Sequence, residues 1–254
     1  MKLLCVGYPK TGSKSCSSAL RKLGFNVADY METAEILSPV WRDYVDGRAT
    51  IDDVIDAYDK HGFDTNQDIP GNYLWEDLYR ALIKRNDTQV ILTVRDSDAA
   101  WWKSWCGFML QECSRGAIGD LCLQGVIGRL AGAGYMGPET EAMTRVVESV
   151  ITTHLDNDIG KGYGLSVKET MVRITKNEKK LRQGYLKHNL YVQSIVPKEN
   201  LLVWNLKDGW APLCAFLDKP IPNESIPHDN RTGDTKFVEK LMFESDFAKV
   251  RLHN

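Results

Sequence analysis

A short glycine-containing loop near the N-terminus has the residue types that bind a phosphate or sulfate group. It reads Pro9-Lys10-Thr11-Gly12-Ser13. Gly12 lets an anion approach the backbone closely, and Lys10 supplies a cationic hydrogen-bond donor. The same anion can accept hydrogen bonds from the hydroxyls of Thr11, Ser13 and Ser15. Taken alone, the loop would also suit an ordinary turn with a solvated lysine.

The elements predicted on either side of this loop favour an anion site. An apolar run rich in strand formers extends from Lys2 to Tyr8, and apolar residues recur at helical spacing from Ser13 to Leu23, before Gly24. A loop between a buried strand and a helix N-terminus presents backbone N–H groups and the positive end of the helix dipole. The sequence therefore predicts that this junction binds a phosphate.

Arg95 stands at a second junction of strand and helix. Gln89 to Val94 is a nearly continuous apolar and β-branched run, typical of a parallel strand buried on both faces. The helix that follows carries Trp101, Trp105 and Phe108 on one face, where they are expected to pack in the core, and Asp96 or Ser97 suits its N-cap. A guanidinium binds phosphate through two parallel hydrogen bonds, so Arg95 is a second candidate anion ligand; an ion pair with Asp96 is the alternative.

The remaining pattern predicts an α/β fold of the P-loop type, with three layers around a central parallel sheet. We expect one domain over residues 1–254, with 112–178, rich in glycine and weakly periodic, as a mostly helical lid that binds the acceptor. Residues 31–61 are polar and helix-prone, and are expected to wrap the outside. The other expected elements are strands at 26–30, 62–65 and 201–206, a turn at 68–72, and helices from about 72 to 82, from about 186 to Pro197 and at 210–217.

Composition excludes several classes of function. A formal charge of -2 with 26% charged residues provides no overall basic field, so nucleic acid and anionic membranes are not expected partners. The six cysteines show no CxxC pair or metal-ligand spacing, which predicts free thiols and no metal site. No signal-peptide core or bilayer-spanning segment is evident, so a cytosolic protein is expected.

Several motifs, in order along the chain, resemble the P-loop sulfotransferase family. Tyr8-Pro9-Lys10-Thr11-Gly12-Ser13 is similar to the family's 5′-phosphosulfate loop, and Arg95 with Ser104 to its 3′-phosphate ligands. One branch also has an Asp-x-Pro turn before an aromatic-rich helix, here Asp68-Ile69-Pro70 and Trp75, and a set of closing segments. The closing segments here are Leu201-Leu202-Val203-Trp204, Lys207-Asp208-Gly209-Trp210-Ala211-Pro212-Leu213 and Ile226-Pro227-His228-Asp229-Asn230.

This resemblance implies a donor and roles for the site residues. The family transfers a sulfuryl group from 3′-phosphoadenosine 5′-phosphosulfate (PAPS), releases 3′-phosphoadenosine 5′-phosphate (PAP), and uses no metal. Lys10 would stabilise the leaving oxygen, with further donor contacts from Pro9, Thr11, Gly12, Ser13, Lys14, Ser15, Arg95 and Ser104.

Two positions depart from the family pattern. Lys14 replaces a hydroxyl residue, and one extra residue separates Arg95 from Ser104, which turns a helical side chain by about 100°. Another branch has an Arg-Lys-Gly loop near the C-terminus, and Arg231-Thr232-Gly233 is a possible counterpart here.

An acceptor hydroxyl benefits from a general base, and Asp68 is the candidate. Many cytosolic sulfotransferases use a histidine beyond the second strand, but none of the five histidines lies in the matching stretch after Phe63. Asp68 follows a candidate strand, so we expect it at the carboxyl edge of the sheet, beside the phosphate loop. Asp64 and His61 are weaker substitutes, and capping ahead of Pro70 is the structural alternative.

Two other functions remain open at this point. A small-molecule kinase using ATP and Mg²⁺ is disfavoured, because the Walker pattern places its lysine directly after the second glycine, whereas Ser13 follows Gly12. A sulfotransferase-like protein that binds the nucleotide without catalysis is the second alternative. For an enzyme, the aromatic residues near the proposed lid suggest a small apolar alcohol or phenol as acceptor; the oligomeric state cannot be read from the sequence.

Overall fold

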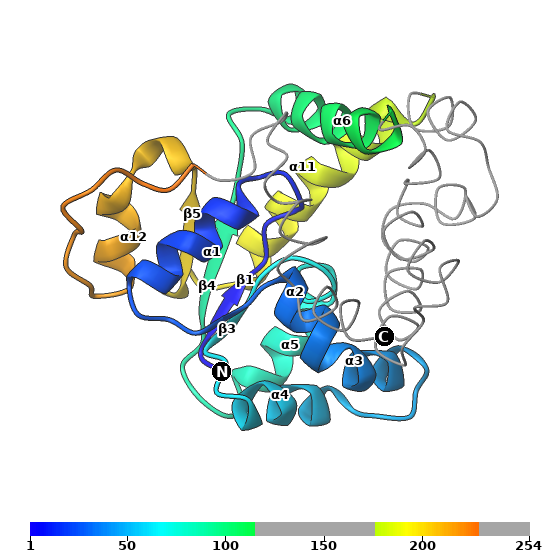
Figure 1. Ribbon diagram of the computed structural model, residues 1–254, viewed down its shortest axis with the longest axis vertical. Helices are drawn as coiled ribbons and strands as arrows, with labels where there is room; N and C mark the ends of the chain where they lie inside the picture. Colours follow the sequence, from blue (N-terminus) through cyan, green and yellow to red (C-terminus); the bar gives the residue numbers. More distant parts are fainter. Residues whose placement is uncertain (115–175, 229–254) are drawn as a thin grey trace, which may run out of the picture.

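A parallel sheet forms the centre of the fold. The computed structural model describes residues 1–114 and 176–228, without the side chains of 108–114. Within these ranges five strands lie in the order β2-β3-β1-β4-β5, and every neighbouring pair is parallel (Figure 1). The strands are β1 (Leu3–Cys5), β2 (Val27–Ala28), β3 (Thr65–Asn66), β4 (Gln89–Thr93) and β5 (Leu201–Trp204).

Helices connect the strands and cover both faces of the sheet, which confirms the predicted α/β fold. They are α1 (Ser13–Lys22), α2 (Tyr30–Glu32), the π-helical η1 (Thr33–Leu37), α3 (Ser38–Val45), α4 (Ile51–Lys60), α5 (Trp75–Leu82), α6 (Asp98–Ser114), α11 (Glu178–Ile195), the 3₁₀ turns η2 (Lys198–Asn200) and η3 (Leu206–Asp208), and α12 (Trp210–Phe216). Most of the proposed lid, residues 115–175, and the Arg231-Thr232-Gly233 segment lie outside the described residues.

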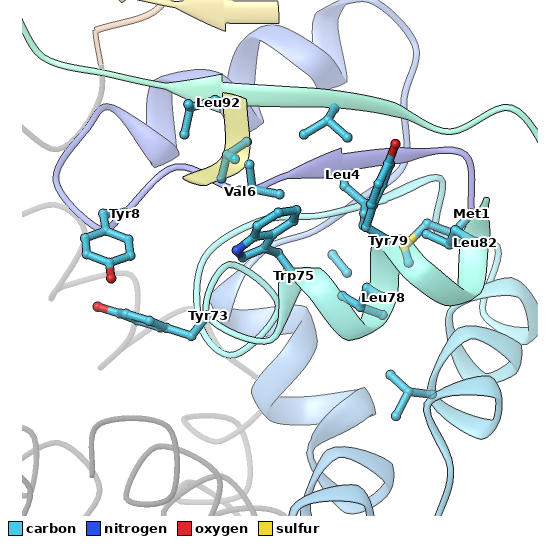
Figure 2. Packing of buried hydrophobic residues seen from close by; sticks show 14 of the residues in the cluster. Met1, Leu4, Val6, Tyr8, Tyr73, Trp75, Leu78, Tyr79, Leu82 and Leu92 are labelled. Carbon is cyan, nitrogen blue, oxygen red and sulfur yellow. The ribbon is translucent and has the colours of Figure 1, made fainter. Parts of the chain in front are cut away.

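Alternate residues of the strands enter two separate cores. Leu3 and Cys5 of β1 pack with Ile91 of β4 against α1 and α12. Leu4 and Val6 face the other side, where side chains of α3, α4, α5, α6 and α11 join them. Figure 2 shows the α5 side of this second core, with Trp75 pointing toward the strands that carry Leu4, Val6 and Leu92. Burial on both faces explains the continuous apolar runs of β1 and β4.

The stretch from 31 to 61 is mostly helical, as expected, and it also contributes buried side chains to the core. Its side chains include Trp41, which is fully buried, and Tyr58, which is 1% exposed. Trp41 Nε1 donates to the Tyr58 hydroxyl over 3.3 Å, so these two polar groups are not buried without a hydrogen-bond partner. Charged residues are spread through this stretch, but α3 turns Trp41 and α4 turns Tyr58 toward the core.

The strand order creates a crevice at the carboxyl edge of the sheet. From β1 the chain moves toward β2, whereas from β4 it leads on to β5, on the opposite side of β1. Where the loops after two neighbouring strands run in opposite directions, a crevice opens between them at the strand ends. Open α/β sheets bind their ligands in such a crevice. The loop from Pro9 to Ser13, called the Lys10 loop below, follows β1, and Arg95 follows β4. The fold therefore brings the two predicted anion ligands to this crevice.

Candidate functional site

The loop after β1 is held in an unusual backbone conformation. Lys10 has φ 70°, and Gly12, the N-cap of α1, has φ 106°. The left-handed region is open to glycine and costs other residues conformational energy. No acidic side chain lies in the first turn of α1, so the N–H groups and dipole of this helix end keep their positive potential. Local geometry therefore matches the predicted anion-binding junction.

A pair of threonines joins this loop to the end of β4. The Oγ1 atom of Thr11 lies 2.6 Å from Tyr8 O, to which it donates, and 2.6 Å from Thr93 Oγ1. Gly7 makes this approach possible, since a Cβ at its position would lie 2.0 Å from Thr93 Oγ1. The Thr11 hydroxyl, which the sequence assigned to the anion, is thus already engaged in holding the loop.

Arg95 lies beside the loop and contacts it directly. Its Nε donates to Lys10 O over 2.7 Å, and its Nη2 donates to Ser104 Oγ over 3.4 Å. Partial burial lowers the pKa of the Arg95 guanidinium, although an arginine remains charged in proteins. The structure therefore brings together Arg95, Ser104 and the Lys10 loop, as the sequence predicted.

One pocket of about 410 Å³ joins these residues. Its walls include every residue predicted to contact the donor except Pro9: Lys10, Thr11, Gly12, Ser13, Lys14, Ser15, Arg95 and Ser104. The carbonyl of Pro9 instead accepts a hydrogen bond from Trp101 Nε1 at 3.0 Å. Trp101 and Trp105 belong to the core, as expected, and neither forms part of the pocket wall.

The pocket is also lined by residues that sequence reasoning did not assign to it. They are Asp96, Ala100, Asn205, Leu206, Lys207 and His228. Asn205 Nδ2 donates to Asp96 over 2.8 Å, and Lys207 pairs with the same carboxylate. Leu206 lies over Gly12, where a Cβ would approach it to 2.3 Å. For Asn205, Leu206 and Lys207 the signal that could have found them is their place directly after β5, at the same sheet edge, and Asp96 follows β4 there.

Asp68 lies at the expected edge of the sheet, two residues after β3, but it is not part of the pocket wall. It has φ 70°, and its carboxylate accepts the N–H of Ile69 at 2.9 Å. Burial raises the pKa of Asp68, Lys14 and Lys10 lower it, and Asp29 raises it further. The substitutes Asp64 and His61 precede β3 and so lie toward the opposite edge, because the strand begins at Thr65 rather than Gly62.

The comparison with known families was decisive for the class of protein. The profile of the sulfotransferase domain matches residues 2–235. The chain belongs to the sulfotransferase family. Over 41 residues it is also 46% identical to Ava biosynthesis cluster protein M from Aspergillus versicolor, a match that covers 16% of this chain and 16% of that protein.

Lys14 makes a contact that its family position did not predict. Its Nζ lies 2.6 Å from the Asp29 carboxylate, and both side chains are largely buried, with 14% and 6% of their surface exposed. Asp29 also caps α2 by accepting the N–H of Tyr30 at 2.7 Å. In this sulfotransferase the lysine therefore joins the Lys10 loop to the start of α2, and its charge acts on Asp68.

No group of three or more His, Cys, Asp or Glu side chains in residues 1–114 and 176–228 is placed to hold a metal ion. Within the same part of the chain, none of the helices combines the length and the apolar character needed to span a bilayer.

Proposed function

We propose that this sulfotransferase transfers a sulfuryl group from PAPS to a hydroxyl or amine of a small acceptor. The observation that carries the proposal is a pocket that joins the Lys10 loop to Arg95 and Ser104. PAPS carries anionic groups at both ends of its ribose, the 5′-phosphosulfate and the 3′-phosphate. A site with two separate cationic ligands suits such a donor better than a nucleotide with only one anionic end.

The residues of the pocket fit the two ends of the donor. The N–H groups that open α1, with Lys10 and the hydroxyls of Ser13 and Ser15, would hold the 5′-phosphosulfate. Arg95 and Ser104 would hold the 3′-phosphate, because the guanidinium offers a planar set of donors beside a hydroxyl.

Lys10 is the residue we propose to stabilise the leaving group. In the transfer, the bond from sulfur to the bridging oxygen breaks while a new bond forms from sulfur to the acceptor oxygen or nitrogen. Negative charge then grows on the phosphate of the nucleotide. By analogy with phosphoryl transfer, a preorganised cation and the N-terminus of α1 would lower this barrier, and no metal is required. Lys10 suits the task because only 9% of it is exposed and it lies on the pocket wall.

Asp68 is the proposed general base for the acceptor. Its carboxylate would take the proton that the hydroxyl or amine loses as the new bond to sulfur forms. Burial raises the pKa of Asp68, which makes its ionised form a stronger base, while Lys14 and Lys10 favour ionisation. The position of Asp68 outside the donor pocket agrees with a role on the acceptor side.

A small acceptor and a cytosolic location complete the proposal. The partial relative takes its name from a biosynthesis cluster, which supports a small molecule as the acceptor. Four cysteines whose side chains the structure describes, Cys5, Cys16, Cys106 and Cys214, are free thiols, which is compatible with a reducing compartment.

Two measurements test the proposal. The first compares thermal stabilisation by PAP with that by ATP and Mg²⁺, since a ligand that binds the folded state raises the unfolding temperature. PAP should stabilise the protein more strongly; the reverse would favour a kinase. The second incubates the protein with PAPS and a panel of small alcohols, phenols and amines, and detects by mass spectrometry the gain of one SO₃ group. Tight PAP binding without transfer to any acceptor would favour a non-catalytic nucleotide-binding protein.

A further inference from the structure

Hydrogen bonds hold the peptide groups on both sides of Lys10. The carbonyl of Pro9 accepts from Trp101 Nε1 at 3.0 Å, and the carbonyl of Lys10 accepts from Arg95 Nε at 2.7 Å. These carbonyls belong to the two peptide planes that meet at the Cα atom of Lys10. Since φ and ψ describe how the two planes are rotated about that atom, fixing both carbonyls fixes both angles. The φ of 70° at Lys10 is therefore maintained by partners outside the loop.

The indole of Trp101 has little freedom to move away from the loop. Only 1% of Trp101 is exposed. Its ring is stacked on Tyr185, with ring centroids 4.8 Å apart and planes 2° apart, and on Trp105 at 5.9 Å and 26°. Rings confined on two sides in this way keep the Nε1 atom directed at Pro9.

Tyr185 completes a closed arrangement around the loop. Its hydroxyl accepts the backbone N–H of Arg95 at 2.9 Å, and Arg95 in turn holds the Lys10 carbonyl. Trp101 comes from α6 and Tyr185 from α11, so two helices distant in sequence act on the same loop. Trp101 contacts the peptide group before Lys10 directly. Tyr185 holds Arg95, which contacts the peptide group after Lys10.

We infer that Trp101 and Tyr185 are a pair of positioning residues that maintain the left-handed backbone of Lys10 and thereby direct its ammonium group. The inference rests on the proposed function, in which Lys10 stabilises the leaving oxygen. A lysine in the left-handed region is strained by an amount similar to the net contribution of one hydrogen bond. Loss of a single contact is therefore enough to let Lys10 adopt other conformations, in which its side chain points elsewhere.

The test compares two tryptophan variants in the same aromatic stack. Trp101→Phe keeps an aromatic ring and removes the Nε1 donor. Trp105→Phe is the matched control, since it makes the same change in a buried ring that stacks on Trp101, and no hydrogen bond from Trp105 to the loop is found among the described residues. For each variant we would measure kcat with an acceptor found in the screen, and the Kd of PAP by calorimetry.

We expect Trp101→Phe to lower kcat about tenfold, the factor that corresponds to losing one neutral hydrogen bond in the transition state alone. The Kd of PAP should change by less than about threefold, because the groups that hold the two phosphates remain. Trp105→Phe should leave both quantities near the wild-type values. A purely structural role would lower kcat equally in the two variants and would overturn the inference, as would wild-type kcat in Trp101→Phe.

A second variant keeps the inference testable if Trp101→Phe does not fold. Tyr185→Phe retains the stacked ring and removes only the hydroxyl that accepts the Arg95 N–H. It should lower kcat severalfold, and an unchanged kcat would overturn the role of Tyr185. Failure of the proposed function itself looks different, because the wild-type protein would then transfer no sulfuryl group to any acceptor, whether or not it binds PAP.

Discussion

Arg95 and Ser104 lie nine residues apart in the sequence, yet Nη2 of Arg95 donates to Oγ of Ser104 over 3.4 Å. The extra residue between them does not rotate Ser104 away, because Asp96 and Ser97 are not helical and α6 begins at Asp98. Ser97 forms the N-cap by accepting the N–H of Ala100 at 3.1 Å. An extra residue in the non-helical link before a helix need not rotate the side chains of that helix, whereas an extra residue inside the helix would turn them by about 100°.

Substitutions at this pair should weaken the binding of the 3′-phosphate. Arg95→Lys removes the planar set of donors, and a charge-assisted hydrogen bond contributes about 1.5–3 kcal/mol, so PAP should bind about 10- to 100-fold more weakly. Ser104→Ala should cost about 1 kcal/mol, or about fivefold. Calorimetry with PAP and with AMP, which lacks the 3′-phosphate, measures both effects.

The preference for PAP over AMP is the informative quantity. It should shrink in Arg95→Lys, whereas Lys103→Ala, an exposed neighbour of Ser104 on α6, should leave it unchanged. An Arg95→Lys variant that still prefers PAP as strongly as the wild type would remove Arg95 from the 3′-phosphate site.

Lys10→Ala should affect turnover far more than binding. Removing one preorganised donor from a developing anion typically lowers kcat by about 100-fold or more, while the N–H groups at the start of α1 still hold the ground-state phosphate. Single-turnover rates and the Kd of PAP separate the two effects. A variant with kcat within about threefold of the wild type would show that Lys10 does not stabilise the leaving oxygen.

Asp68→Asn should abolish turnover and leave PAP binding intact. A base must be ionised to accept a proton, so kcat/KM of the wild type should fall as the pH drops through the pKa of Asp68. Burial raises that pKa, which places the acid limb of the profile above the ordinary carboxyl range of about 4. Near-normal turnover in Asp68→Asn would rule this residue out as the base.

Lys14→Ser should move the same acid limb to higher pH. Lys14 favours the ionised form of Asp68, so removing its charge raises the pKa of Asp68 further, and more alkaline pH is then needed for full activity. Lys22→Ser is a matched control on α1, since Lys22 pairs with Glu224 at the surface. A pH profile of Lys14→Ser that coincides with that of Lys22→Ser would contradict an influence of Lys14 on the base.

Sequence reasoning located the parts of the site that depend on local pattern. The junctions at Lys10 and Arg95 follow continuous apolar strands, and Asp68 follows a strand that begins at Thr65, three residues later than predicted. The contacts of Lys14 with Asp29 and of Trp101 with Pro9 could not be predicted, because they join segments that only the tertiary fold brings together. The burial of Trp41 was missed because charged residues are interspersed along 31–61 and obscure the apolar face of each helix.

Gly7→Ala should destabilise the protein because the end of β1 lies so close to the end of β4. A Cβ at position 7 would meet the Thr93 side chain at 2.0 Å and the Thr93 carbonyl at 2.8 Å, and the backbone atom cannot rotate away. Overpacking of this kind costs about 1–3 kcal/mol, or several degrees in the unfolding temperature of a chain of this size. It would also separate Thr11 from Thr93 and so weaken PAP binding.

Gly184→Ala provides the contrasting control for this prediction. Gly184 lies inside α11, and a Cβ there would meet nothing within 4 Å. Alanine restricts the unfolded chain and favours the helix, so the variant should be about 0.4–1 kcal/mol more stable, with unchanged PAP affinity. Thermal unfolding with and without PAP measures both variants. Equal unfolding temperatures for Gly7→Ala and the wild type would mean that the two strand ends can separate without cost, and would contradict a tight connection between the Lys10 loop and β4.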